Sequence, residues 1–193
     1  MGVKSVLVTG ASTGIGEACA LRLDRIGHRV YAGVRSEEHV HGLRQRGSDR
    51  IVPVFLDVTD QAQIDAAAKQ LANDGGRLDG VVNNAGVGRG GPLEYLPLEI
   101  WREQLEVNVL GQVAVTKAVL PFIRAARGRI VFIGSISGRV ATMLTGPVRR
   151  VEVRDRGDRR VAARRAASVG HQRVRGRARG DQDADLGQGP AGG

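Results

Sequence analysis

The chain has a single cysteine, Cys19, among its 193 residues, so no disulfide can form within it. No stretch approaches the roughly 18 apolar residues that suggest a membrane span. The first twelve residues also carry too short an apolar run for a signal peptide. These absences predict a soluble protein of a reducing compartment. We expect it to lie in the cytoplasm and to have no membrane partner.

The last 46 residues lack whole classes of side chain that the first 147 use: Phe, Tyr, Trp, Ile, Lys, Thr, Asn and Met. They hold 12 Arg against six acidic residues, and thus supply +6 of the chain's formal charge of +9. Residues 148–193 also show no apolar period of either a helix or a strand. The composition therefore predicts two segments, a domain over residues 1–147 and a disordered, Arg-rich tail over residues 148–193.

Within the first segment, short β-rich runs alternate with longer helical runs. The expected strands are Val3–Thr9, Arg29–Val34, Ile51–Leu56, Leu78–Asn83 and Arg129–Ser135. The expected helices are Ile15–Ile26, Glu37–Arg46, Gln61–Asn73 and Leu98–Ala126. This alternation predicts a doubly wound parallel α/β sheet that is cut short after its fifth strand. In the longest helix, we expect an apolar stripe of Leu105, Val109, Val113 and Leu120 to cover the sheet.

A glycine-rich turn joins the first expected strand to the first helix. Gly10, Gly14 and Gly16 follow the spacing Gly-x-x-x-Gly-x-Gly. Such glycines permit a tight turn and let backbone N–H groups approach a pyrophosphate at the positive end of a helix. Taken alone, the turn is as often only a connection in an α/β protein. With Thr9 before it, it resembles the cofactor turn of the short-chain dehydrogenase/reductase family.

Four further motifs extend this resemblance in the order and spacing of the family, over residues 3 to about 147. Leu56-Asp57-Val58-Thr59 is similar to the strand end whose Asp contacts adenine, and Asn83-Asn84-Ala85-Gly86 to the family's Asn-Asn-Ala-Gly motif. Asn108 matches the helix Asn that holds a water of the proton relay. Ser135 matches the catalytic Ser; Ser137 is an alternative, but Ser135 lies thirteen residues before position 148, the interval usual in the family.

The resemblance implies a Rossmann-type domain that binds NADP or NAD, with Ser135 and Asn108 as its catalytic residues. The cofactor-binding residues that it implies are Gly10, Ser12, Thr13, Gly14, Ile15, Gly16, Arg35, Asp57, Val58, Asn84, Ala85 and Gly86. Each match also has a structural interpretation: a turn-forming Asn, a buried Asn bonded to backbone, or a hydroxyl at a strand end. The four histidines show no ligand spacing, and we expect no metal site.

Arg35 bears on the choice of cofactor. It follows Val34, at a strand end where an NAD-preferring protein would place an Asp or Glu for the ribose 2′-hydroxyl. Val34 cannot form that bond, whereas Arg35 could bind a 2′-phosphate, which favours NADP(H). The alternative is a solvated Arg, and Thr13 is not the basic residue that many NADP-binding members carry in the glycine turn.

The family pattern breaks after Pro147. The resemblance requires Tyr-x-x-x-Lys, a proton-transferring Tyr and a Lys that lowers its pKa, and these positions hold Val148 and Glu152. After Pro147, every residue except Ser168 is of a type whose codons start with G or C. A shift of one base in a GC-rich gene would produce this bias, and residues 148–155 read one base over permit Tyr-Ala-Ala-Ser-Lys-Phe-Ala-Ile. We infer a frameshift, real or introduced by sequencing.

The sequence thus predicts a truncated oxidoreductase domain whose parent exchanges hydride with a small-molecule secondary alcohol or ketone. Two alternatives stay open: a catalytically silent nucleotide-binding protein, and a nucleic-acid-binding protein that uses the Arg-rich tail without reading bases. We expect no specific nucleic acid as a partner. Intact relatives are expected to be homo-oligomers, and the oligomeric state of this chain stays open.

Overall fold

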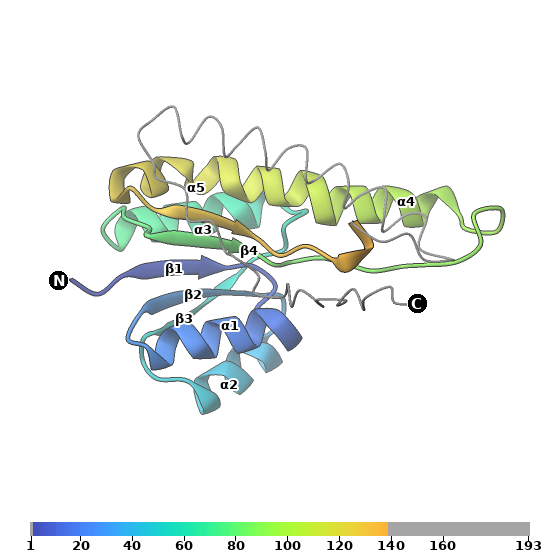
Figure 1. Ribbon diagram of the computed structural model, residues 1–193. Coiled ribbons are helices and arrows are strands. Elements are labelled where there is room, and N and C mark those ends of the chain that lie inside the picture. The colour runs from blue at the N-terminus through green and yellow to red at the C-terminus, as the bar shows by residue number, and fades with distance from the viewer. Residues whose placement is uncertain (1, 139–193) are drawn as a thin grey trace, which may run out of the picture.

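Five strands form one parallel sheet in the computed structural model, which describes residues 2–138 (Figure 1). Their order across the sheet is β3-β2-β1-β4-β5. The strands are β1 (Ser5–Val8), β2 (Arg29–Val34), β3 (Ile51–Phe55), β4 (Gly80–Asn83) and β5 (Arg129–Phe132). The predicted doubly wound parallel sheet is confirmed. The prediction of a disordered tail over residues 148–193 lies outside the described residues.

Helices cover both faces of this sheet (Figure 1). One face carries α1 (Gly14–Arg25) and α2 (Glu37–Arg46). The other carries α3 (Gln61–Asn73), α4 (Leu98–Leu105) and α5 (Gln112–Ala126). A π-helical turn over Glu106–Gly111 joins α4 to α5 without interrupting the helical course. The arrangement is a three-layer α/β/α sandwich with a separate hydrophobic core on each face.

Alternation along β1 shows how the two cores are filled. Val6 and Val8 face α1 and α2, where they join a cluster of small and β-branched side chains. Leu7 between them faces α3 and α5, in the cluster that includes Val81 and Val115. Successive side chains of a strand point to opposite faces, so a central strand that is covered on both sides needs a continuous apolar run.

The long helix corrects one prediction. Of the expected apolar stripe, only Val109 is buried; Leu105 and Leu120 are partly exposed, and Val113 is 41% exposed. The buried side-chain positions of the helix are instead Gln104, Asn108, Val109, Gln112, Val115, Val119 and Ile123. The apolar period misled because three inward-facing positions are carboxamides, and because the π-helical turn shifts the facing surface between α4 and α5.

The same helix bears on the expectation that no stretch is apolar enough to suggest a membrane span. Taken together, Leu98–Ala126 forms a helix of 29 residues with a window of mean hydropathy 1.4, so by length and composition it is apolar enough to cross a membrane. In this fold its apolar residues Val115, Val119 and Ile123 belong to the core between the helix and the sheet. A core helix and a membrane span share these properties, and composition alone does not separate them.

Asp24 ties α1 to the loop before β3. Its side chain is buried, and its carboxylate accepts hydrogen bonds from the Ser48 backbone N–H at 3.0 Å and the Ser48 hydroxyl at 2.5 Å. The Arg50 Nε lies 3.2 Å from the same carboxylate. Burial by itself raises the pKa of Asp24, but the bonds from Ser48 and the charge of Arg50 lower it more, so the pKa lies below its ordinary value of 3.8.

We predict that Asp24→Asn destabilises the fold at neutral pH by about 1–3 kcal/mol, because it weakens charge-assisted hydrogen bonds. A carboxyl whose pKa is lower in the folded state stabilises the fold above its unfolded pKa, and this contribution is lost as pH falls through the folded value. Urea unfolding of both proteins at pH 7 and near pH 3 should show the difference shrinking in acid. Asp65→Asn, on an exposed position of α3, is the control, and an equal difference at both pH values would contradict the prediction.

Candidate functional site

The C-terminal edge of the sheet gathers most of the predicted site residues. The glycine turn follows β1, Asp57 lies just beyond β3, Asn84 follows β4, and Ser135 comes shortly after β5. Because all strands are parallel, their carboxyl ends meet at one edge, where open α/β sheets bind ligands. The structure therefore brings together residues that are far apart in the sequence.

Two glycines of the turn are required by close packing. Gly10 has a φ of +62°, and a Cβ there would lie 2.8 Å from the Ala85 Cα. At Gly16, inside α1, a Cβ would lie 2.1 Å from the Gly10 carbonyl oxygen and 2.4 Å from the Asn84 Nδ2. These contacts are with backbone or with a held side chain, so the turn and the helix can approach only with glycine at both positions.

The start of α1 offers uncapped backbone donors. Thr13 stands at the N-cap position in extended conformation, and its side chain makes no capping hydrogen bond. A Cβ at Gly14 would meet nothing within 4 Å, and Ile15 is 62% exposed. Ser12, just before the helix, is partly buried. An open helix N-terminus of this kind suits an anionic group such as a pyrophosphate, because the first-turn N–H groups lack intrahelical acceptors.

Asn84 and Thr9 lock the glycine turn to the end of β4. The Asn84 side-chain amide donates to the carbonyl oxygens of Thr9 and Gly10, each at 3.0 Å. The buried Thr9 hydroxyl oxygen in turn accepts from the backbone N–H groups of Asn84 at 2.9 Å and Ala85 at 3.0 Å. This reciprocal set fixes the turn in the shape that the glycines permit.

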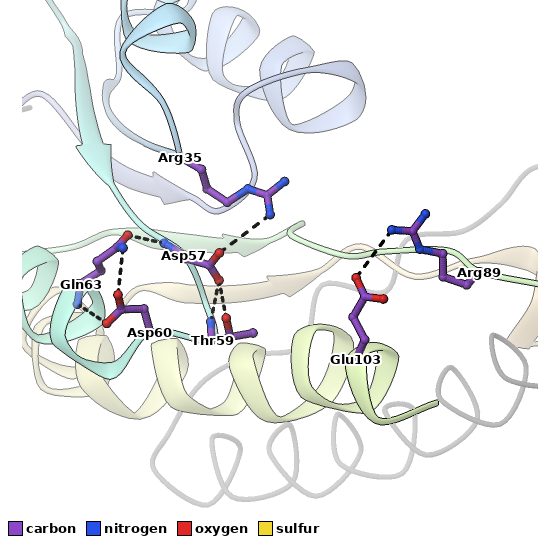
Figure 2. Close-up of polar contacts among 7 residues, drawn as sticks. All are labelled: Arg35, Asp57, Thr59, Asp60, Gln63, Arg89 and Glu103. Carbon is purple, nitrogen blue, oxygen red and sulfur yellow. Dashed lines mark hydrogen bonds and ion pairs between the residues drawn. The ribbon is translucent and has the colours of Figure 1, made fainter. Parts of the chain in front are cut away.

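Arg35 and Asp57 face each other across the ends of β2 and β3 (Figure 2). Their closest approach is 3.8 Å, and the Arg35 side chain is 70% exposed. Asp57 also accepts from the Thr59 N–H at 2.9 Å and the Thr59 hydroxyl at 2.7 Å. Burial raises the pKa of Asp57, but the bonds from Thr59 and the charge of Arg35 outweigh it, so the pKa is lowered. The ion pair is exposed and weak enough for Arg35 to turn to another anion.

A cavity of about 220 Å³ lies beside the glycine turn. Its lining includes Asn84, Ala85, Gly86, Asn108 and Ser135, five residues that the sequence singled out for the site. Two predicted catalytic residues and three predicted cofactor contacts thus share one space, large enough for a flat ring system and close to the end of the glycine turn.

The two predicted catalytic residues are held differently within this cavity. Asn108 is buried, and its carboxamide is paired with the backbone of Val87: Oδ1 accepts from the N–H and Nδ2 donates to the carbonyl, both at 2.8 Å. The Ser135 hydroxyl oxygen accepts from the Ser137 N–H at 3.1 Å. The backbone-bonded interpretation of Asn108 is therefore seen directly, and its role in a water relay stays a prediction.

Val58 lies outside this cavity. It is buried, and a Cβ on Gly111 would come within 2.7 Å of its Cγ2. Its side chain therefore packs the loop after β3 against the backbone of the π-helical turn. The structure supports a packing role for this side chain, and the predicted contact of Val58 with the cofactor stays a prediction. Val148 and Glu152 lie outside the described residues.

Sequence reasoning missed two carboxamides at this edge. The buried side chain of Gln104 bonds both backbone groups of Arg89, and Gln112 donates to the Ala85 carbonyl oxygen at 3.4 Å. Their spacing with Asn108, four residues apart along one helix, was the available signal. Polar residues on an inward stripe are easily read as a solvated face.

A larger groove of about 590 Å³ lies at the opposite edge of the sheet. Arg29 and Arg77 line it, but each is paired with an aspartate, Asp74 at 3.3 Å and Asp79 at 3.1 Å. Its charges are therefore largely balanced, and it lies at the amino ends of the parallel strands. The smaller cavity is the better candidate, because it joins an open helix N-terminus to convergent polar groups.

Known proteins are similar to this chain over most of its length. The family model for short chain dehydrogenases matches residues 4–147. Among curated relatives, 17-beta-hydroxysteroid dehydrogenase type 6 of Bos taurus is 43% identical over 142 residues, and retinol dehydrogenase 16 of Mus musculus is 40% identical over 141 residues. Each alignment covers 72% of this chain but only 44% of the relative, so the chain spans less than half the length of these relatives.

Solved structures show the same similarity. A short-chain dehydrogenase from Streptomyces avermitilis superposes with a TM-score of 0.81 at 32% identity, covering 87% of this chain and 62% of that one. An alcohol dehydrogenase from the archaeon Thermococcus sibiricus, complexed with 5-hydroxy-NADP, superposes with a TM-score of 0.79 at 29% identity, covering 86% of this chain and 72% of that one.

Proposed function

This chain belongs to the short-chain dehydrogenase family, and from that premise we propose that its described domain binds NADP(H) in preference to NAD(H). We further propose that it derives from an oxidoreductase that exchanges hydride between this cofactor and a secondary alcohol or ketone. The family is one of oxidoreductases that use NAD(P). The preference for NADP(H) and the class of substrate are our proposals for this chain.

One observation carries the proposal: the glycine turn, an uncapped helix start and a polar-walled cavity lie side by side at the carboxyl edge of the sheet. A dinucleotide needs these three elements in this order, because its pyrophosphate bridges an adenosine half and a nicotinamide half. The pyrophosphate would lie against the backbone of Gly14 to Gly16. Asp57 and Arg35 would face the adenosine half, and the cavity would take the nicotinamide half.

When bound, the nicotinamide supplies or accepts the hydride. The chain's own residues would orient the substrate oxygen and exclude water around it. In this proposal the Ser135 hydroxyl donates a hydrogen bond to the substrate oxygen. Asn108 keeps the π-helical turn beside the cavity, where the resemblance places the water of the proton relay.

The chain as written lacks the proton-transferring Tyr and its Lys, so we propose that it binds nucleotide without turnover. The family match ends at residue 147, the residue at which the composition changes. This coincidence supports the frameshift proposal, in which the parent gene encodes Tyr-x-x-x-Lys from position 148. A silent nucleotide-binding protein is the second candidate, and it is favoured by Val148 and Glu152 if the reading frame is correct.

Arg35 provides the test of the proposed preference. We predict that Arg35→Ala weakens NADPH binding roughly tenfold or more, because a charge-assisted bond to the 2′-phosphate contributes about 1.5–3 kcal/mol. NADH binding should change little, since NADH carries no 2′-phosphate and Asp57 remains. Calorimetric or fluorescence titration of both nucleotides measures the two affinities.

Arg129→Ala is the matched control for this titration. It removes the same charge from an exposed position at the start of β5, on the opposite edge of the sheet. It should leave both affinities nearly unchanged. Equal losses of NADPH and NADH affinity in Arg35→Ala would show that Arg35 is only a surface charge and does not bind the 2′-phosphate.

A further inference from the structure

The segment after β4 is rich in glycine. Residues 85–91 read Ala-Gly-Val-Gly-Arg-Gly-Gly and belong to neither a helix nor a strand. Glycine loses more conformational freedom on folding than any other residue, so such a segment is costly to hold in one shape. Some part of the fold must supply the hydrogen bonds that a neighbouring strand would otherwise provide.

Two carboxamides of the long helix supply those bonds. Gln104 accepts from the Arg89 N–H at 3.1 Å and donates to the Arg89 carbonyl at 3.2 Å. Asn108, one helical turn further on, forms the same pair of bonds with Val87, both at 2.8 Å. Each side chain thus satisfies both backbone groups of one residue, as a residue of a neighbouring β-strand does.

The spacing of the two partners explains why the pattern repeats. Helix residues four apart lie on one face, and every second residue of an extended chain presents its backbone groups to the same side. Helix positions 104, 108 and 112 therefore keep step with backbone positions 89, 87 and 85, running in opposite directions. The bond from Gln112 to Ala85 is the longest of the series at 3.4 Å, and it lies just past the π-helical turn.

This segment forms a wall of the candidate cavity. Gly86 and Gly88 line the space together with Ser135. A Cβ on Gly88 would meet nothing within 4 Å, so this backbone borders open space. Asn108 and Gln112 line the same space and Gln104 does not, and the three carboxamides together determine where this backbone wall lies.

The segment also brings Arg89 close to Glu103 of α4. Its guanidinium lies 3.7 Å from the Glu103 carboxylate, and its side chain is 57% exposed (Figure 2). That outer ion pair is weak. The two bonds to the fully buried Gln104 are therefore the main constraint on the backbone at this point.

We propose that Gln104 is a positioning residue: it holds residues 87–89 in register with the helix and thereby fixes the wall of the pocket that receives the nicotinamide half of the cofactor. It touches no ligand itself. The assignment of the pocket rests on the proposed function, whereas the holding of the segment does not. Gln104 extends to a second helical turn the support that Asn108 gives.

Gln104→Leu and Gln104→Glu test the proposal in the full chain. Leu keeps the volume but removes both bonds, so the Arg89 amide hydrogen should exchange roughly tenfold or more faster. A protonated Glu can accept from the Arg89 N–H and donate to its carbonyl, as Gln does, whereas an ionised Glu cannot donate. Burial raises the pKa of such a carboxyl. As pH falls from 7 to 5, the Arg89 amide of the Gln104→Glu protein should therefore come to exchange more slowly than that of the Gln104→Leu protein at the same pH.

NADPH titration of the same proteins tests the consequence for the pocket. Gln104→Leu should weaken NADPH binding several-fold at both pH values, and Gln104→Glu should regain affinity at pH 5. Gln45→Leu, an exposed carboxamide on α2, is the matched control and should change neither measurement.

The outcomes separate the two proposals. Unchanged Arg89 exchange in Gln104→Leu, or Arg89 exchange in Gln104→Glu that is no slower than in Gln104→Leu at pH 5, would overturn the holding role. Faster exchange with unaltered NADPH affinity would overturn the link to the pocket. If the unmodified chain binds no NADPH, the proposed function fails, while the exchange measurements still decide whether Gln104 holds the segment.

Discussion

Removing one base near the codon for Val148 is expected to give an NADP(H)- or NAD(H)-linked enzyme for secondary alcohols or ketones, whereas we expect no turnover from the present chain. The edited gene would encode Tyr-x-x-x-Lys from position 148. The carboxyl edge of the sheet already holds Ser135, Asn108 and the glycine turn. General acid–base catalysis by a positioned side chain contributes about 10²–10⁴-fold, so the gain should be at least about a hundredfold over the background. Absorbance of NADPH and NADH at 340 nm, over a panel of substrates, measures it.

The double substitution Val148→Tyr with Glu152→Lys is the control for this experiment. It restores the two side chains but leaves them in a segment without the apolar period of a docked helix. A displacement of about 1 Å can cost on the order of a hundredfold in rate, so we expect no rescue. An inactive product from the edited gene, or turnover by the present chain, would show that the frameshift account is wrong.

The second large effect is expected at Gly16. Gly16→Ala should abolish measurable nucleotide binding and destabilise the fold by about 1–3 kcal/mol, as overpacked sites do. The added methyl would overlap the Gly10 carbonyl and the Asn84 amide, and both belong to the set that shapes the turn. Thermal unfolding and NADPH titration measure the two effects.

Gly42→Ala gives this prediction a matched control, because Gly42 also lies within a helix. Its Cβ would meet only the flexible end of the Arg46 side chain, at 3.1 Å. Alanine forms helices better than glycine by up to about 1 kcal/mol, so this variant should be as stable as the original chain or more so. Similar behaviour of the two variants would contradict the packing argument at Gly16.

The sequence predicted the elements well where punctuation residues bound them. The bounds of Arg29–Val34, Glu37–Arg46 and Gln61–Asn73 agree with the structure at both ends. Gly, Pro or Asp marks nearly every junction, and these residues stop helices and strands for local steric reasons. The parallel pairing also followed, because alternation of strands and helices leaves few other topologies.

The sequence could not predict contacts that join separate elements through polar side chains. Gln104 and Gln112 face inward, against the rule that buried helix faces are apolar, since their partners are backbone groups of a loop with no period of its own. The pair of Arg35 with Asp57 arises because β2 and β3 are neighbours in the sheet. In each case the partner is determined by tertiary arrangement, which a local pattern does not contain.

The position of β1 governs the order in which this sheet can assemble. It precedes the other four described strands in the chain, yet it lies in the middle of the sheet, between β2 and β4. Its pairing with β2 closes a short loop, whereas its other edge must wait until Gly80–Asn83 has been synthesised. Contacts of such high sequence separation slow folding, so we expect β1 to pair with β2 before it pairs with β4.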